Sequence, residues 1–313
     1  MVALEWQTIA VIIISLGFLI KSADVAVGAI SRYAKRVGIS DYLIGLLIVA
    51  VGTSLPELST AITGSFSGFG NLILGDVIGA NIIDVTVVLG LMAIVGRKIK
   101  ITSRILGNTM FVTMSMVILP FLLGFDGEFS RFDGIVLITA FVLYIIRLWN
   151  KEGKMGKIKK DVPLKLIYRD MISFIIAVPI LLLSANFLIA NSIKVAYAFN
   201  VPPILIGLTL IAIGTTAPEI TVEIRSVLKG CKDVGFGDLL GSVVVNSSLV
   251  LGIAALIRPF TYEVTVFIPA ITFMVTAVFI GLLFLKQKEI TWHEGIGLML
   301  LYVTFLVSQG IAV

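Results

Sequence analysis

Ten long apolar segments separated by short polar stretches run along this 313-residue chain. A helix needs about 20 apolar residues to cross the hydrocarbon core of a bilayer, and each segment approaches or exceeds that length. Several are longer than the minimum, which predicts tilted or internally broken helices. The predicted spans are residues 5–31, 41–66, 71–96, 103–124, 132–149, 168–194, 203–227, 235–257, 263–285 and 292–312.

The composition agrees with a membrane protein. Hydrophobic residues make up 58% of the chain and charged residues only 14%, against about 25% charged in soluble proteins. This composition argues against assigning the chain to the soluble, disordered or nucleic-acid-binding proteins. The single cysteine, Cys231, and the single histidine, His293, exclude a disulfide framework and a multi-histidine metal site. Any metal ion must therefore be held by oxygen atoms.

The distribution of basic residues predicts the orientation in the membrane, because Lys and Arg collect in short cytoplasmic loops. One alternating set of loops holds 20 of the 24 Lys and Arg residues, and the other set holds three. We therefore expect a multi-pass protein of the cell membrane with both termini extracellular and the central basic loop cytoplasmic. No basic residue precedes the first apolar segment and no cleavage-type site follows it, so we interpret it as a membrane helix and not a secretion signal.

The two halves of the chain repeat each other at an offset of 162 residues. The segment LIGLLIVAVGTSLPE (residues 43–57) aligns with LIGLTLIAIGTTAPE (residues 205–219), with nine of fifteen positions identical. The same offset places Asp84 on Asn246 without a gap. An offset maintained over several helices indicates duplication. Because each half holds five spans, an odd number, the halves must cross the membrane in opposite directions.

The predicted fold class is an all-α membrane protein of ten transmembrane helices, in two inverted-topology five-helix repeats with broken helices at the midplane. We place the first repeat at residues 1–150, a basic cytoplasmic linker at 151–166 and the second repeat at 167–313. Inverted repeats are typical of secondary transporters, whose ions bind between the halves.

The repeated segments contain the predicted breaks. Pro56 and Pro218 lack an N–H group, which frees the carbonyls of Gly52 and Gly214. Such groups are tolerated in a membrane where they face protein or a water-filled cavity. Small residues could instead serve close helix packing. Hydroxyl groups flank both breaks, at Thr53, Ser54, Thr215 and Thr216.

Acidic residues supply the candidate chemistry. Glu57 and Glu219 follow the two prolines, and Asp84 lies within the third span. A charge at that depth costs at least ~2.5 kcal/mol, and no basic residue nearby in sequence pairs with these groups. Together with the amide of Asn246 they offer the oxygen ligands that Ca²⁺ prefers, about 6–8 in flexible geometry. The absence of thiolate and imidazole ligands disfavours zinc and copper.

The paired GTSLPE and GTTAPE motifs resemble the alpha repeats of the calcium/cation antiporter superfamily, which includes sodium/calcium and proton/calcium exchangers. The resemblance covers nearly the whole chain. It implies that each motif's glutamate binds Ca²⁺, that a side-chain oxygen 27 positions later completes the site, and that the first and sixth spans form the moving gate. The implied ion-binding residues are Glu57, Asp84, Glu219, Asn246, Ala50, Thr53, Ser54, Ala212, Thr215, Thr216 and Ser242, with Ala50 and Ala212 contributing backbone carbonyls.

Departures from the motif bear on the coupling ion. Ala80 replaces an expected serine, whereas its repeat mate Ser242 is retained, so a hydroxyl that would help to dehydrate Na⁺ is missing. The chain therefore looks most like an archaeal or bacterial proton/calcium exchanger of the CAX type. Archaeal sodium/calcium exchangers usually have asparagine in the first repeat and aspartate in the second, whereas this chain has Asp84 in the first and Asn246 in the second. The GTSLPE sequence, however, is closer to that of sodium/calcium exchangers. Sodium coupling at the same site is the alternative.

Other function classes fit less well. A cation channel usually needs symmetric subunits around a continuous pore, and no nucleophile–base pair or phosphate-binding loop suggests an enzyme. The expected partners are Ca²⁺, H⁺ or Na⁺, and the lipid bilayer, with no cofactor, nucleic acid or obligate protein partner. We expect Asp76 and Asp238 to cap helices, and Glu223 to lie at a solvated helix end beside Arg225.

Overall fold

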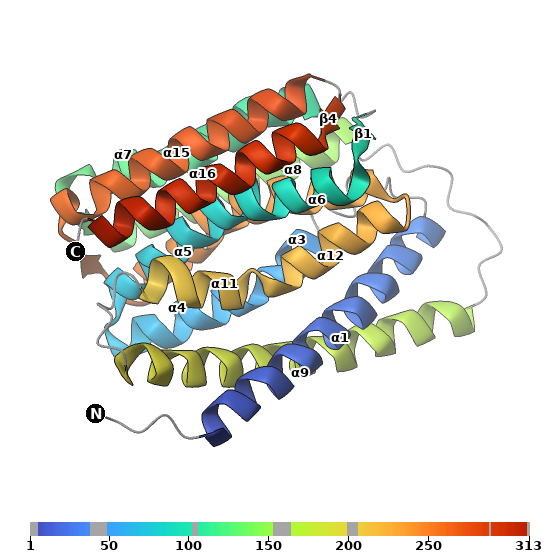
Figure 1. The fold of residues 1–313 in the computed structure, drawn as a ribbon, viewed down its shortest axis with the longest axis horizontal. Helices are drawn as coiled ribbons and strands as arrows, with labels where there is room; N and C mark the ends of the chain where they lie inside the picture. Colours follow the sequence, from blue (N-terminus) through green and yellow to red (C-terminus); the bar gives the residue numbers. More distant parts are fainter. Residues whose placement is uncertain are drawn as a thin grey trace.

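The computed structural model describes residues 6–37, 49–101, 106–152, 164–198, 206–287 and 289–311. Its helices run roughly along one long axis in a layered bundle (Figure 1). The α-helices are α1 (Trp6–Val37), α3 (Ala50–Thr53), α4 (Leu55–Ser67), α5 (Gly70–Ile83), α6 (Leu89–Gly96), α7 (Leu106–Leu123), α8 (Arg131–Glu152), α9 (Leu164–Ala198), α11 (Ala212–Thr215), α12 (Ala217–Leu228), α13 (Lys232–Val244), α14 (Leu251–Ile257), α15 (Val264–Lys286) and α16 (Trp292–Ile311). The π-helical segments are η2 (Asp84–Val88), η4 (Ile206–Ile211) and η5 (Val245–Val250), and η3 (Gly124–Asp126) is a 3₁₀ helix.

Several predicted spans coincide closely with observed helices. The span predicted at 71–96 is the continuous helix Gly70–Gly96, and the span at 235–257 is Lys232–Ile257. Together with Val264–Lys286, these are the three helices in the described ranges that are long and apolar enough to cross a membrane. The ten-span count remains a prediction, because part of the second, fourth and seventh segments lies outside the described residues.

Helices α5 and α13 lie at the centre of the bundle. Their side chains are buried along almost the whole length, so neither helix presents a continuous face to the outside of the bundle. Helix α5 packs against η4 and α11 from the other half of the chain, and α13 packs against α3. Each central helix therefore contacts the motif segment of the opposite half.

Gly79 permits one of these close contacts. A Cβ atom at this position would lie 2.4 Å from the carbonyl oxygen of Leu208 and 2.7 Å from the Cβ of Ala212. Both are less than real Cβ contacts allow, and a backbone atom cannot move aside cheaply. The absence of a side chain at Gly79 is thus required by helix packing.

We expect Gly79→Ala to lower the free energy of unfolding by about 1–3 kcal/mol, because it overpacks this interface. Gly297→Ala in α16 is the matched control, since no heavy atom lies within 4 Å of the added Cβ. Alanine also favours a helix over glycine by about 1 kcal/mol, so the control is expected to keep or gain stability. Thermal unfolding in detergent measures the stability of both variants. Equal unfolding midpoint temperatures for Gly79→Ala and Gly297→Ala would contradict the packing argument.

Two short antiparallel sheets connect the halves. Strand β1 (Lys98–Lys100) pairs with β4 (Glu289–Thr291), with Ile99 opposite Ile290. Strand β2 (Glu128–Phe129) pairs with β3 (Phe260–Thr261), with Phe129 opposite Phe260. Each sheet takes one strand from each half of the chain, so the halves are tied together outside the helices.

Helices α1 and α9 lie side by side and form the layer at the lower edge of Figure 1. The Nε atom of Arg32 on α1 donates to Oδ1 of Asp170 on α9 at 3.1 Å. A second ion pair joins Asp24 on α1 to Arg225 on α12, with 2.5 Å between Oδ2 and Nη1. Charged contacts thus attach α1 both to α9 and to a motif helix.

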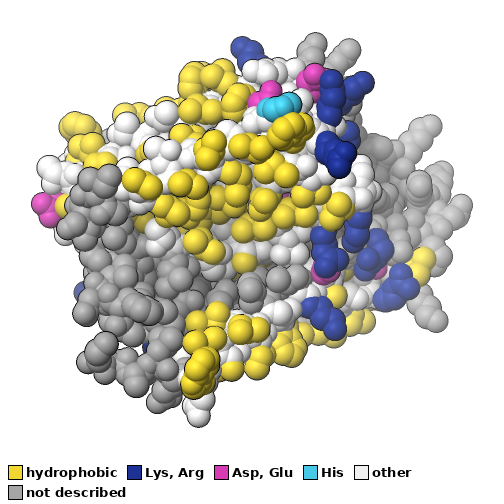
Figure 2. Space-filling model, viewed as in Figure 1, with side chains coloured by type: hydrophobic (Ala, Val, Ile, Leu, Met, Phe, Trp, Pro, Cys, Tyr) yellow, Lys and Arg dark blue, Asp and Glu magenta, His cyan; other side chains and the backbone are white. Residues whose placement is uncertain are grey.

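Apolar and basic side chains occupy different parts of the surface. Figure 2 shows a broad apolar band across the middle of this face, and Lys and Arg side chains gathered toward the end where β1 and β4 lie. Leu300, Val303 and Val307 on α16 are 52–60% exposed. An exposed apolar band with basic residues at one end is the surface expected of a helix bundle in a membrane.

Candidate ion-binding site

Both repeated motifs contain a helix break. Helix α3 ends at Thr53 and α4 begins at Leu55, while α11 ends at Thr215 and α12 begins at Ala217. Ser54 and Thr216 lie between the two parts of each helix, two residues before the prolines. The prolines then fall in the first turn of the following helix, where a missing N–H costs little. The predicted breaks are confirmed, and both halves form them at equivalent positions.

The π-helical segments are a feature that the sequence did not indicate. Asp84 is the first residue of η2, Asn246 is the second residue of η5, and Ala212 directly follows η4. A π turn inserts an extra residue into a helix and is frequent at functional sites. These segments change the helix register next to three of the predicted ion-binding residues.

All eleven predicted ion-binding residues are buried. Exposure is 0% at Glu57 and Asp84 and 1% at Glu219 and Asn246. In the described part of the chain, the carboxylate oxygens of the three acids and the amide of Asn246 make no hydrogen bond, and nor do the hydroxyls of Ser54, Thr216 and Ser242. Buried polar groups are nearly always paired. A set of unpaired oxygens from both halves therefore indicates a site that receives a ligand.

The acidic groups lie within electrostatic range of each other. Glu57 is repelled by Glu219 and Asp76, and Asp84 is repelled by Glu57. Thr215 lies near the Glu57 carboxylate and Thr53 near that of Glu219, without reaching ordinary hydrogen-bond geometry. The structure thus brings the two glutamates and Asp84 into one acidic region.

The balance of charge and geometry limits how an ion is held. Within the described ranges, the basic residues form their ion pairs with Asp24, Asp170 and Glu289, away from the central acids. No three described Asp, Glu, His or Cys side chains are placed to hold a metal ion by themselves. An ion in this region would therefore also need hydroxyl or backbone carbonyl oxygens.

Asp76 and Asp238 are not helix caps, so that expectation was wrong. Both are buried, inside helices that begin six residues earlier, at Gly70 and Lys232. The Thr215 hydroxyl donates to Oδ1 of Asp76, and the Thr53 hydroxyl donates to Oδ1 of Asp238, each at 3.1 Å. Each aspartate therefore contacts the helix break of the opposite half.

Glu223 is also placed differently from its prediction. It is 0% exposed, and neither carboxylate oxygen is hydrogen-bonded within the described residues. Asp238, Asp84 and Glu219 repel it, while Arg225 pairs with Asp24 instead. Its spacing of four residues from Glu219 was the available signal, because residues i and i+4 share a helix face.

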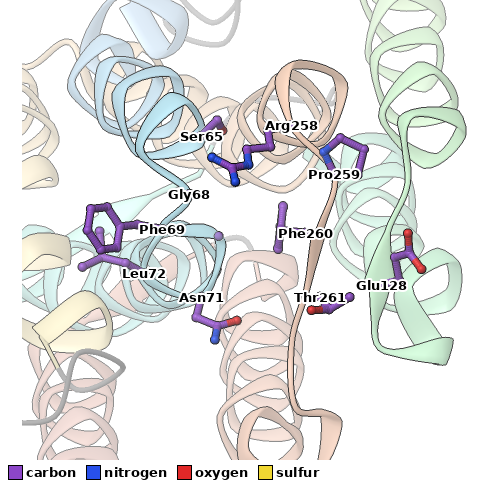
Figure 3. Close-up of a pocket in the computed structure, with 11 residues that line it drawn as sticks. Ser65, Gly68, Phe69, Asn71, Leu72, Glu128, Arg258, Pro259, Phe260 and Thr261 are labelled. Atoms are coloured by element: carbon purple, nitrogen blue, oxygen red, sulfur yellow. The ribbon is translucent and has the colours of Figure 1, made fainter.

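The surface pocket in Figure 3 lies elsewhere. It has a volume of about 430 Å³ and is lined by the turn from α4 to α5 and by the segment from Arg258 to β3. Arg258 and Glu128 are its charged residues, and none of the eleven predicted ion-binding residues lines it. This pocket is therefore separate from the acidic region.

Both the sequence and the structure of this chain are similar to those of known proteins. The sequence matches the family described as sodium/calcium exchanger protein over residues 7–150 and 170–310. It is 25% identical over 340 residues to the sodium/calcium exchanger MaX1 of Methanosarcina acetivorans, covering 95% of this chain and 97% of the relative. It is 30% identical over 263 residues to the inner membrane protein YrbG of Escherichia coli K12, covering 80% of each. A solved structure of the sodium-calcium exchanger NCX_Mj, soaked with 10 mM Na⁺ and zero Ca²⁺, matches with a TM-score of 0.82 and 26% identity over 98% of this chain and 99% of that chain.

Proposed function

The chain belongs to the sodium/calcium exchanger protein family, a family of membrane cation exchangers, and from this premise we propose that it exchanges Ca²⁺ for H⁺ across the cell membrane by alternating access. The observation that carries the proposal is the buried set of unpaired oxygens contributed by both halves. A charged, unpaired group inside a membrane protein is a functional site by default.

The proposed Ca²⁺ ligands come from four elements. Glu57 and Glu219 follow the two helix breaks, and Asp84 and Asn246 lie in the π segments of the central helices. Ca²⁺ takes about 6–8 oxygen ligands at flexible angles, and the carbonyls of Ala50 and Ala212 with nearby hydroxyls supply the remainder. The full proposed set also includes the backbone carbonyls of Thr53 and Thr215, whose hydroxyls donate to aspartates, and the unpaired hydroxyls of Ser54, Thr216 and Ser242.

Proton coupling is supported by the side chains at two repeat-related positions. Ala80 has no hydroxyl, whereas Ser242 at the equivalent position has one that is buried and unpaired in the described structure. A dehydrated Na⁺ needs several neutral oxygen ligands, while a proton needs only a carboxylate. Glu223 is a further buried acid that could carry a proton. The equivalent position in the first half of the chain is Ala61, which has no ionisable group.

Sodium coupling is the second candidate. MaX1 and NCX_Mj are both named as exchangers of sodium and calcium, and they match this chain over nearly its whole length. The hydroxyls at Ser54, Thr216 and Ser242 could serve Na⁺ as well as Ca²⁺. Uptake of Ca²⁺ into proteoliposomes under separately imposed pH and sodium gradients tests the proposal and separates the two candidates.

The proposed architecture has ten transmembrane spans in two inverted repeats, residues 1–150 and 167–313, joined by a linker at 151–166. Matched helix contacts support it. An added Cβ at Gly90 of α6 would lie 2.9 Å from the carbonyl of Gly295 on α16, and one at Gly252 of α14 would lie 3.1 Å from that of Gly134 on α8. Equivalent helices of the two halves thus make equivalent close contacts.

Alternating access follows from the cost of moving an empty site. Several carboxylates close together in a low-dielectric region repel one another and cannot all stay bare. The site therefore crosses between its two access states only when Ca²⁺ or the counter-cations neutralise it. We assign the moving gate to α1 and α9, which lie side by side along the motif helices α12 and α4.

Labelling of introduced cysteines would test the proposed orientation. In a Cys231→Ser background, we expect Lys100→Cys to react with impermeant reagents from the cytoplasmic side only and Glu128→Cys from the outside only. Both parental residues are exposed, on β1 and β2, and α7 lies between them in the chain. Labelling of both cysteines from the same side would contradict a span across α7.

A further inference from the structure

The hydroxyl of Thr53 has three acceptors within reach and only one proton to donate. The distances from its Oγ1 are 3.1 Å to the carbonyl oxygen of Val49, 3.3 Å to that of Ala50 and 3.1 Å to Oδ1 of Asp238. The first two acceptors belong to its own helix, and the third comes from the other half of the chain. The choice of acceptor therefore decides whether the helix carbonyls stay free of this hydroxyl.

The equivalent threonine in the second half has the same surroundings. Oγ1 of Thr215 lies 3.1 Å from the carbonyl of Ile211, 3.2 Å from that of Ala212 and 3.1 Å from Oδ1 of Asp76. Both threonines and both aspartates are at most 2% exposed. The arrangement thus occurs twice, once at each helix break, with each aspartate supplied by the opposite half.

The carbonyls of Ala50 and Ala212 already accept one hydrogen bond each. The N–H of Ser54 donates to Ala50 at 3.0 Å, and the N–H of Thr216 donates to Ala212 at 2.9 Å. A carbonyl oxygen has two lone pairs. A threonine hydroxyl donating to the same oxygen would occupy the second lone pair and leave none for a cation.

We propose that Asp76 and Asp238 are positioning residues of the exchange site: each accepts the threonine hydroxyl of the opposite half and so keeps the neighbouring alanine carbonyl free to bind the transported ion. This inference rests on the proposed function. It also explains why a polar residue is buried at these two positions of the central helices. The aspartates act through the threonines and do not touch the ion.

A purely structural tie between the halves is the competing explanation, and a double variant separates the two. We expect Asp238→Ala to raise the half-saturating Ca²⁺ concentration about tenfold, because the released Thr53 hydroxyl then donates to the carbonyls of Val49 and Ala50, at 3.1 and 3.3 Å, and competes with the ion for Ala50. Adding Thr53→Val removes that hydroxyl, keeps the backbone carbonyl through which Thr53 is proposed to bind Ca²⁺, and should restore the value to within about threefold of the parent. Asp238→Asn keeps an oxygen acceptor and should stay within the same range.

The measurement is uptake of labelled Ca²⁺ into proteoliposomes over a range of Ca²⁺ concentrations, combined with the change in thermal unfolding temperature when Ca²⁺ is added in detergent. Thr60→Val is the matched control: Thr60 is buried on α4, and its hydroxyl donates to the carbonyl of Pro56, within its own helix, at 3.0 Å. It should leave the half-saturating concentration unchanged. If Asp238→Ala does not fold, the pair Asp76→Ala and Asp76→Ala with Thr215→Val carries the same test.

The outcomes separate this inference from the proposed function. A parent protein that neither takes up Ca²⁺ nor is stabilised by it would overturn both. With an active parent, a double variant at least as impaired as Asp238→Ala would show a structural tie and overturn the positioning role. Parental affinity in Asp238→Ala would overturn it as well.

Discussion

Glu57→Gln and Glu219→Gln are each expected to reduce Ca²⁺ uptake at least about 25-fold. Glutamine keeps the volume of the side chain and removes its charge. Losing one member of a buried interaction between charges costs roughly 2–5 kcal/mol, and each 1.4 kcal/mol is a factor of ten. Initial rates of labelled Ca²⁺ uptake into proteoliposomes at matched protein content measure the loss.

Glu263→Gln is the control for this pair. Glu263 precedes α15, is exposed and lies outside the predicted ion-binding set, so the same change of charge should leave the uptake rate at the parental level. Thermal unfolding in detergent checks that the variants fold. Parental exchange rates in a folded Glu57→Gln or Glu219→Gln variant would contradict the proposed site.

The second large effect concerns the coupling ion. We expect a pH gradient to drive Ca²⁺ uptake by the parent protein and a sodium gradient at fixed pH to drive little. Protons compete with Ca²⁺ for the carboxylates of Glu57, Asp84 and Glu219, so acidification on the Ca²⁺-binding side should lower the apparent Ca²⁺ affinity. Each gradient is imposed while the other ion is held equal across the membrane.

Ala80→Ser then tests the reason for this preference. Restoring the hydroxyl gives Na⁺ an additional oxygen ligand, and one hydrogen-bond-sized interaction of about 1 kcal/mol corresponds to roughly fivefold stronger sodium competition. Proton competition should change little. A parent that responds to the sodium gradient and ignores the pH gradient would instead establish the sodium candidate.

The sequence predicted the parts of the site that depend on local chain chemistry. Proline at 56 and 218 fixes the two helix breaks, because a missing N–H acts on the residue four positions earlier regardless of tertiary contacts. The offset of 162 residues predicted which residues are equivalent. The structure shows breaks at Ser54 and Thr216 accordingly.

The sequence did not predict contacts between distant residues. Asp76 looked like a cap because it follows a glycine, yet α5 begins earlier and the partner of Asp76 is Thr215, in the other half. Glu223 looked solvated because Arg225 is adjacent, but α1 supplies Asp24 to that arginine. In both cases a residue more than 130 positions away determines the environment, and no local pattern reveals it.

Counterflow of labelled Ca²⁺ most directly tests the claim that this chain is an exchanger. Sealed proteoliposomes are loaded with unlabelled Ca²⁺, diluted into a low concentration of labelled Ca²⁺, and held at equal pH, sodium and membrane potential on both sides. A carrier with alternating access returns with external label each time it releases internal Ca²⁺, so we expect transient accumulation of label above its equilibrium level, abolished in Glu57→Gln. A channel would discharge the gradient without accumulation, and that result would contradict the account.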